Sequence, residues 1–112
     1  MMTRGCQMLV FPGAFNTTTG PLHWNLLMRG RAVDNQLFVA AVSPARDTAN
    51  PKAYQVFGHS SVVSPWGNVL ATCDEGEAVV VSEIDLALVD EMRKQIPALK
   101  QKRSDLYSLV AK

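Results

Sequence analysis

Cysteine and histidine, the side chains that most often build metal sites and nucleophilic centres, are scarce in this chain. Its 112 residues include two cysteines and two histidines. His23 and His59 each stand without a second histidine or cysteine at ligand spacing, so no metal site is predicted. Cys6 and Cys73 lie far apart without a CxxC pattern and are interpreted as free thiols. We therefore predict neither a metal nor a cofactor.

The sequence also lacks an excess of either charge and any long apolar run. Its formal net charge is +1 at pH 7, whereas nucleic-acid-binding proteins usually carry a clear basic excess. No run approaches the roughly 20 apolar residues that a membrane-spanning helix needs. Polar residues interrupt the apolar stretch at positions 4–7, so no signal peptide is recognised and a reducing compartment is expected. Neither nucleic acid nor a membrane is expected as a partner.

The composition of the chain is typical of one globular domain, with 47% hydrophobic and 19% charged residues. The near-continuous apolar run at residues 6–11 predicts a strand buried on both faces, in the middle of a sheet. A helix is predicted next, with Thr19 as its N-cap, Pro21 in its first turn and its end near Asn35. Its predicted buried stripe consists of Leu22, Leu26, Arg29 and Val33, flanked by Trp24 and Leu27.

Residues 36–42 predict a second buried strand, and a strand–helix–strand unit at this spacing predicts parallel pairing. After a surface loop, residues 59–72 predict a bulged hairpin, because Pro65 and Gly67 suit its turn. Residues 78–81 predict one more strand. Asp85 then caps a final helix that Pro97 ends, with an apolar face of Leu86, Val89, Met92 and Ile96.

Motifs of catalysis are missing: the chain has no GxSxG, P-loop, Rossmann glycine pattern or HExxH. Cys6 heads a buried strand and is interpreted as a core residue. Cys73 has acidic neighbours and is interpreted as a spectator. His59, at a strand entry, is predicted to orient a loop by hydrogen bonding, and His23 to lie on the helix surface or to pack. These patterns alone do not define a function.

Longer strings resemble the nitrilase, or carbon–nitrogen hydrolase, superfamily. They are FPGAFN (11–16), TGPLHW (19–24), RGRAVDNQ (29–36), GHSSVV (58–63) and PWGNVLA (65–71). SPARD (43–47) and RKQIPALKQKRSDLY (93–107) resemble the omega-amidase branch in particular. The motifs occur in order over nearly the whole chain. Residues 1–112 are therefore interpreted as the C-terminal part of a single carbon–nitrogen hydrolase domain, with the sandwich part at 1–97 and a tail at 98–112.

The resemblance implies an α/β fold of four-layer type, a nitrilase-like αββα sandwich that is incomplete in this chain, and a homodimer of the complete enzyme. It also implies hydrolysis of small-molecule omega-amidic acids, such as alpha-ketoglutaramate and alpha-ketosuccinamate, to a dicarboxylate and ammonia. The family's chemistry uses a Glu base, a Lys beside the oxyanion and a Cys thiolate that forms a thioester. A cytoplasmic location is expected, and a mitochondrial one in addition.

None of those three catalytic groups is assigned to a residue of this chain, because the resemblance places all of them upstream of Met1. We predict no catalytic residue here and no activity from the chain by itself. The resemblance instead places the loop after the first strand over the acyl site. The predicted substrate-pocket wall consists of Phe15, Asn16, Thr17, Thr18 and Thr19.

Two other interpretations stay open. One is a non-catalytic fragment that dimerises or interacts with full-length relatives. The other is a different nitrilase-type amidase, such as a ureidopropionase-like enzyme, which fits the residues less well.

Overall fold

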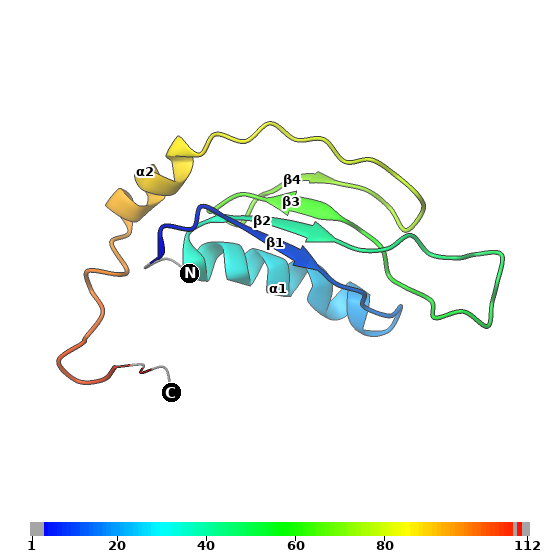
Figure 1. The fold of residues 1–112 in the computed structure, drawn as a ribbon, viewed down its shortest axis with the longest axis horizontal. Helices are drawn as coiled ribbons and strands as arrows, with labels where there is room; N and C mark the ends of the chain where they lie inside the picture. Colours follow the sequence, from blue (N-terminus) through cyan, green and yellow to red (C-terminus); the bar gives the residue numbers. More distant parts are fainter. Residues whose placement is uncertain (1–3, 109, 111–112) are drawn as a thin grey trace.

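A computed structural model describes residues 4–108 and 110, and this part of the chain forms four strands and two helices in a mixed α/β arrangement. The elements are β1 (Met8–Pro12), α1 (Thr19–Asn35), β2 (Phe38–Val42), β3 (Ser61–Val63), β4 (Val69–Thr72) and α2 (Ala87–Gln95). The strands form one sheet in the order β1-β2-β3-β4. Figure 1 shows α1 along one face of this sheet and α2 beyond one end of it. The predicted α/β class is confirmed.

The parallel β1–α1–β2 unit is confirmed. Strands β1 and β2 pair in parallel from Met8↔Phe38 to Pro12↔Val42, and α1 makes the crossover between them. The predicted hairpin is confirmed as well: β3 and β4 are antiparallel, with a register shift between Val62 and Val63. Gly67 closes its turn at φ +80°, a conformation that glycine adopts without strain.

The hydrophobic core lies between α1 and the sheet, and it uses a different face of α1 from the predicted one. The buried residues of α1 are Gly20, Trp24, Met28 and Ala32, four apart along one side of the helix. They pack with Leu37, Val39, Ala41 and Val63. The predicted stripe is wrong: Leu22, Leu26, Arg29 and Val33 are exposed. Because α1 carries large apolar residues on both sides, its own sequence does not determine which side is buried.

Strand β1 lies at an edge of the sheet, so its predicted position in the middle of a sheet is wrong for the described residues, and so is its predicted burial on both faces. Alternate side chains point to opposite faces. Leu9 and Phe11 pack against the core, whereas Val10 points to the other face and is 60% exposed.

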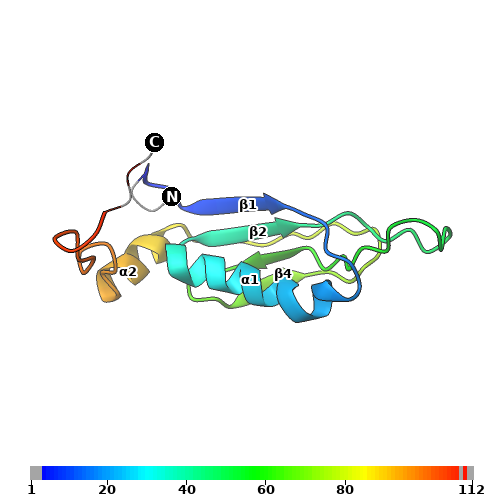
Figure 2. The same cartoon turned by 90° about the horizontal axis from the view of Figure 1, so that it is seen from below.

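The predicted strand at residues 78–81 is also not formed. This segment crosses over the sheet face opposite α1 (Figures 1 and 2) and takes part in no strand ladder within the described residues. Val79 and Val81 are 91% and 85% exposed. Valine-rich sequence favours a strand, but a strand needs a neighbour for its backbone hydrogen bonds, and none of the four strands pairs with it.

Helix α2 begins at Ala87 with Leu86 at the N-cap position, one residue beyond the predicted cap Asp85, whose Oδ1 accepts a hydrogen bond from the Ala87 N–H at 2.9 Å. Val89 and Met92 are its buried side chains, and Leu86 and Ile96 are exposed. Gln36 Nε2 donates to Ile96 O at 2.7 Å, which ties the end of α1 to the end of α2.

Beyond α2, residues 98–108 contain no helix or strand. The predicted domain range 1–112 also includes residues 1–3, 109 and 111–112, which lie outside the described residues. No helix in the described part has both the length and the apolar character to cross a bilayer.

Candidate functional site

The predicted pocket-wall loop leaves the sheet where β1 and β2 both end. The Gly13 N–H donates to Val42 O at 2.9 Å, so the start of the loop is fixed to the last residue of β2. This end of the molecule also carries residues 43–60 and the turn after β4 (Figure 1). In open α/β sheets, ligands bind beyond the carboxyl ends of the parallel strands. The loop is therefore at a position where a ligand site is expected.

Asn16 organises this loop. Its Oδ1 accepts hydrogen bonds from the backbone N–H groups of Thr18 (3.0 Å) and Thr19 (2.7 Å) and from the Thr19 hydroxyl (3.0 Å). Its backbone carbonyl accepts from the Gly20 N–H at 2.8 Å. The prediction that Thr19 is the N-cap is wrong, because α1 begins at Thr19 with Thr18 at the N-cap position, and the side-chain acceptor for the first N–H groups is Asn16 Oδ1. Asparagine bonds readily to the backbone two or three residues ahead, and its amide oxygen reaches further than a hydroxyl.

Thr17 and Thr18 are the exposed members of the loop. Their hydroxyls take part in no hydrogen bond within the described part of the chain, which leaves them available to a ligand. The Asn16 Nδ2 group is likewise unused by the described residues. Because Oδ1 is committed to the turn, Nδ2 points away from it as a donor.

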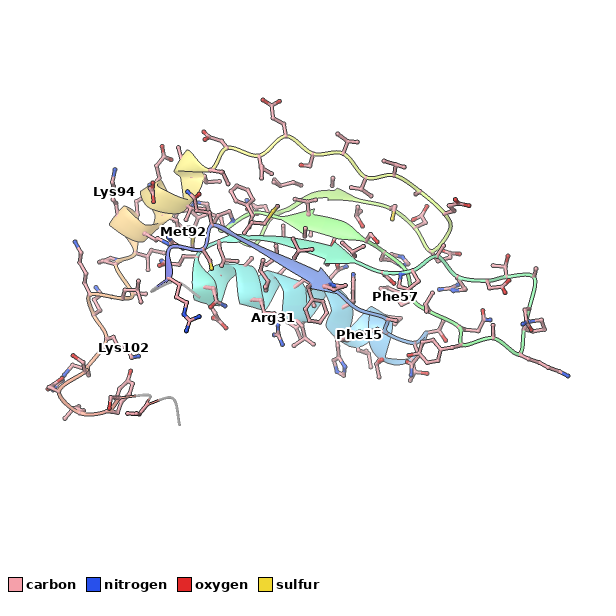
Figure 3. All side chains as sticks on the ribbon, in the orientation of Figure 1. Phe15, Arg31, Phe57, Met92, Lys94 and Lys102 are labelled. Atoms are coloured by element: carbon pink, nitrogen blue, oxygen red, sulfur yellow. The ribbon has the colours of Figure 1, made fainter. Side chains whose placement is uncertain are left out.

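Phe15 has a different role from its four neighbours. Its ring meets the Trp24 ring edge-on, with centroids 5.2 Å apart and planes at 72°. Its backbone carbonyl accepts a hydrogen bond from the Phe57 N–H at 2.7 Å. Figure 3 shows Phe15 and Phe57 side by side at the loop end of the sheet. Phe15 thus anchors the loop to the core. Its side chain is only half-buried, so part of it is still exposed at the candidate site.

His59 holds the entry to β3, as predicted from the sequence. Its Nδ1 lies 2.7 Å from Phe57 O and donates a hydrogen bond in the tautomer that carries the proton on Nδ1. Its ring stacks on the Phe57 ring with centroids 3.9 Å apart. Its own carbonyl accepts from Trp24 Nε1 at 2.8 Å. These contacts make His59 a part of the loop framework. His23 is exposed on α1, in agreement with its predicted surface position.

A small hollow of ≈150 Å³ lies at the same end, lined by residues 43–45, 58–60, 73–74 and 76–78. The sequence did not predict it, and its lining does not include the loop 15–19. Its wall is braced by Ser60, whose hydroxyl accepts from the Ser43 N–H at 2.9 Å and donates to Ser43 O at 3.2 Å. Cys73 Sγ donates to Ser60 O at 3.7 Å. The GHS string at 58–60 is the one signal in the sequence that points to this hollow.

Cys6 and Cys73 are free thiols in the structure, as predicted. Cys6 is half-buried and packs against the core cluster, at the opposite end of β1 from the loop. Arg93 Nη2 donates to its backbone carbonyl at 2.7 Å. Because Cys6 lies at the far end of the strand from the loop 15–19, the two do not form one site.

Comparisons with known proteins identify the family. Residues 1–94 match the family described as carbon-nitrogen hydrolase. The omega-amidase NIT2 of Pongo abelii is 61% identical over 109 residues, which cover 97% of this chain and 39% of that protein. The chain therefore spans about two fifths of the length of this relative.

Solved structures agree with this match. The NitFhit protein of C. elegans has a TM-score of 0.88 and 46% identity, over 96% of this chain and 26% of that chain. Saccharomyces cerevisiae Nit3, a member of branch 10 of the nitrilase superfamily, has a TM-score of 0.83 and 44% identity, over 91% and 37%. The resemblance seen in the sequence motifs is confirmed. The chain belongs to the carbon–nitrogen hydrolase family of the nitrilase superfamily, and omega-amidases are among its relatives.

Proposed function

We propose that this chain forms part of an omega-amidase, a hydrolase that cleaves the terminal amide of omega-amidic acids to a dicarboxylate and ammonia. The observation that carries the proposal is 61% identity to an omega-amidase over 97% of the chain. The nucleophilic Cys, the Glu base and the Lys that the family's thioester chemistry uses are expected outside these 112 residues. The contribution of this chain is then to bind and orient substrate.

The loop 15–19 has the chemistry to receive the substrate's distal carboxylate. The exposed hydroxyls of Thr17 and Thr18 and the Nδ2 group of Asn16 are donors that the described residues leave unused. They stand at the N-terminus of α1, a helix of 17 residues without an acidic residue in its first turn. The partial positive charge of a helix N-terminus favours an anion there.

A chimeric enzyme tests the proposal directly. The 109 matching residues of the Pongo abelii omega-amidase are replaced by those of this chain, so that the relative supplies the rest of the domain. We expect the chimera to release ammonia from alpha-ketoglutaramate. A folded chimera without turnover of any omega-amidic acid, beside an active parent enzyme, would contradict the proposal.

The Thr17→Val/Thr18→Val double variant of the chimera tests the loop. It should lower kcat/KM for alpha-ketoglutaramate more than for a small uncharged amide such as butyramide. Expressed as a free energy, the difference between the two losses should be about 1–3 kcal/mol, the cost of unpairing a polar contact that bound substrate buries. Thr48→Val is the matched control, since Thr48 is an exposed threonine in another loop. Equal losses on both substrates would mean that the two threonines support the fold and do not bind the carboxylate.

The chain by itself is expected to be inactive, because among the described residues neither thiol has a Glu and a Lys placed as the family's chemistry uses them. Incubated with alpha-ketoglutaramate, the purified 112-residue chain should release no ammonia above background. Turnover that disappears in Cys6→Ser would overturn the structural role assigned to Cys6.

We also propose that the complete enzyme is a homodimer that uses the outer face of α1. Leu22 and Leu26 are 66% and 67% exposed there, and Val33 and Trp66 are exposed beside Gly30. Such a row of apolar side chains is typical of a surface that another protein covers. Leu26→Glu should shift the chimera from dimer to monomer in light scattering, whereas Asn25→Glu, an exposed polar neighbour on the same helix, should not. An unchanged dimer in Leu26→Glu would place the interface elsewhere.

A further inference from the structure

Arg46 joins three segments of the loop end. Its side chain is 21% exposed, and Nε donates to Val56 O at 2.7 Å while Nη2 donates to Phe57 O at 3.2 Å. Its Nη1 lies 3.6 Å from Glu75 Oε1, and its backbone N–H donates to Glu75 O at 2.8 Å. One guanidinium thus connects the loop after β2, the entry to β3 and the turn after β4.

The segment that accepts the hydrogen bonds of Arg46, residues 56 and 57, also contacts the candidate pocket loop. Val56 forms an antiparallel bridge with Asn16, and the Phe57 N–H donates to Phe15 O at 2.7 Å. The Phe57 ring lies directly against the backbone of Gly20, at the start of α1. Figure 3 shows Phe57 beside Phe15 at this end of the sheet. The position of residues 15–20 therefore depends on where residues 56 and 57 are fixed.

We propose that Arg46, held by Glu75, is a positioning residue that sets the geometry of the loop 15–19 and through it the recognition of the substrate carboxylate. This inference rests on the proposed function of that loop. Arg46 itself faces the carbonyl groups of Val56 and Phe57, so it acts through them and not by contact with substrate.

Arginine suits this position better than lysine. The planar guanidinium presents several donors in a fixed fork, so it can bond two successive carbonyls and still face a carboxylate. A lysine ammonium is a point charge on a flexible stem and fixes fewer of these groups at once. Val56 is only 6% exposed, so loss of Arg46 leaves a backbone carbonyl at position 56 with little access to water. Residues 56 and 57 would shift to find a new donor, and the loop 15–19 would shift with them.

The chimera described above separates positioning from general stability. Arg46→Gln should raise KM for alpha-ketoglutaramate about tenfold or more while kcat changes less than about threefold, and butyramide should lose much less. Arg46→Lys should recover part of the KM. Arg93→Gln is the matched control, because Arg93 also donates to a distant carbonyl, that of Cys6, at the other end of the sheet. Equal losses on both substrates in Arg46→Gln, or the same selectivity change in Arg93→Gln, would overturn the proposal.

Amide hydrogen exchange in the 112-residue chain gives a readout that does not depend on turnover. Arg46→Gln should speed exchange about tenfold or more at the N–H groups of Thr19, Gly20 and Phe57, whose acceptors belong to the loop. Arg93→Gln should leave these three amides unchanged. Unchanged exchange in Arg46→Gln would overturn the proposal even if the chimera were inactive. An inactive wild-type chimera would count against the proposed function alone.

Discussion

Replacement of Gly20 by alanine puts a methyl group where the first turn of α1 meets Phe57. A β-carbon at position 20 falls 2.2 Å from Cγ and 2.3 Å from Cβ of Phe57, far inside van der Waals contact. Rotation about χ1 moves the ring but leaves the Phe57 Cβ in place. The clash therefore persists unless the backbone of one segment moves.

The Phe57 backbone resists such a movement. Its N–H donates to Phe15 O at 2.7 Å, its carbonyl accepts from Arg46, and its ring stacks on His59. Overpacking of a well-packed contact costs about 1–3 kcal/mol, and we expect the upper end of this range here. Alanine is the better helix former by about 1 kcal/mol. The free energy of unfolding should thus fall by about 2 kcal/mol in Gly20→Ala.

Gly30→Ala is the matched control in the same helix. A β-carbon at position 30 meets no atom of the described residues within 4 Å. The helix preference of alanine then acts without opposition, and the free energy of unfolding of the isolated chain should rise by about 1 kcal/mol. The two alanine variants should differ by about 3 kcal/mol, which for a domain of this size corresponds to more than about 10 °C in Tm.

Urea unfolding followed by tryptophan fluorescence measures the difference. Trp24 is fully buried in the core, whereas Trp66 is exposed, so a Trp66→Phe background isolates the signal of the core. A neutral or stabilising Gly20→Ala would refute the reasoning, because Phe57 would not be fixed against α1. A destabilising Gly30→Ala would show that another surface covers the outer face of the helix.

Three further predictions follow from single contacts. Asn16→Ala should lower the free energy of unfolding by about 1–2 kcal/mol because the capping acceptor of α1 is lost, whereas Asn16→Asp keeps that acceptor. If urea unfolding gave Asn16→Ala and the exposed control Thr17→Ala the same stability, the cap would be disproved. Ser60→Ala should lower the free energy of unfolding by about 1 kcal/mol, because Ser60 exchanges two hydrogen bonds with Ser43. Ser61→Ala should be neutral or stabilising, because the buried Ser61 Oγ has no partner in the described residues. The reverse order of stability in thermal unfolding would contradict this reasoning. The hydrogen bond from Arg103 lowers the pKa of Asp105, so the contact between the two side chains is favoured above the usual pKa of an aspartate and is lost as pH falls through the lowered value. Arg103→Gln should return the pKa of Asp105 toward its usual value in an NMR titration, and an unchanged pKa would speak against the contact.

Local patterns in the sequence determined much of the fold. The apolar runs around residues 6–11 and 36–42 are joined by a helix. They specify a parallel pair, because two parallel strands need a crossover connection of about a dozen residues or more, and this connection is usually a helix. The turn at Pro65 and Gly67 specifies the hairpin, because a glycine there reaches positive φ without strain. The acceptor at Asp85 and the breaker at Pro97 bracket α2. Each of these signals lies within a few residues of the structure that it specifies.

The candidate site depended on more than local signals. Family resemblance placed the loop 15–19, but the sequence offered Thr19 as the helix cap, and only the folded loop shows that Asn16 supplies the acceptor. The links from Arg46 to Val56 and Phe57 cross ten and eleven residues of irregular chain, and no periodicity predicts them.

Tertiary structure alone decided which faces are buried and which apolar segments become strands. Helix α1 carries leucines on one side and Trp24, Met28 and Ala32 on the other, and the sheet buries the second set. Residues 78–81 have the composition of a strand, yet they pair with none of the described strands. The physical reason is the same in both cases. Burial and strand pairing each need a partner surface, and the residues of one segment do not encode where that surface lies.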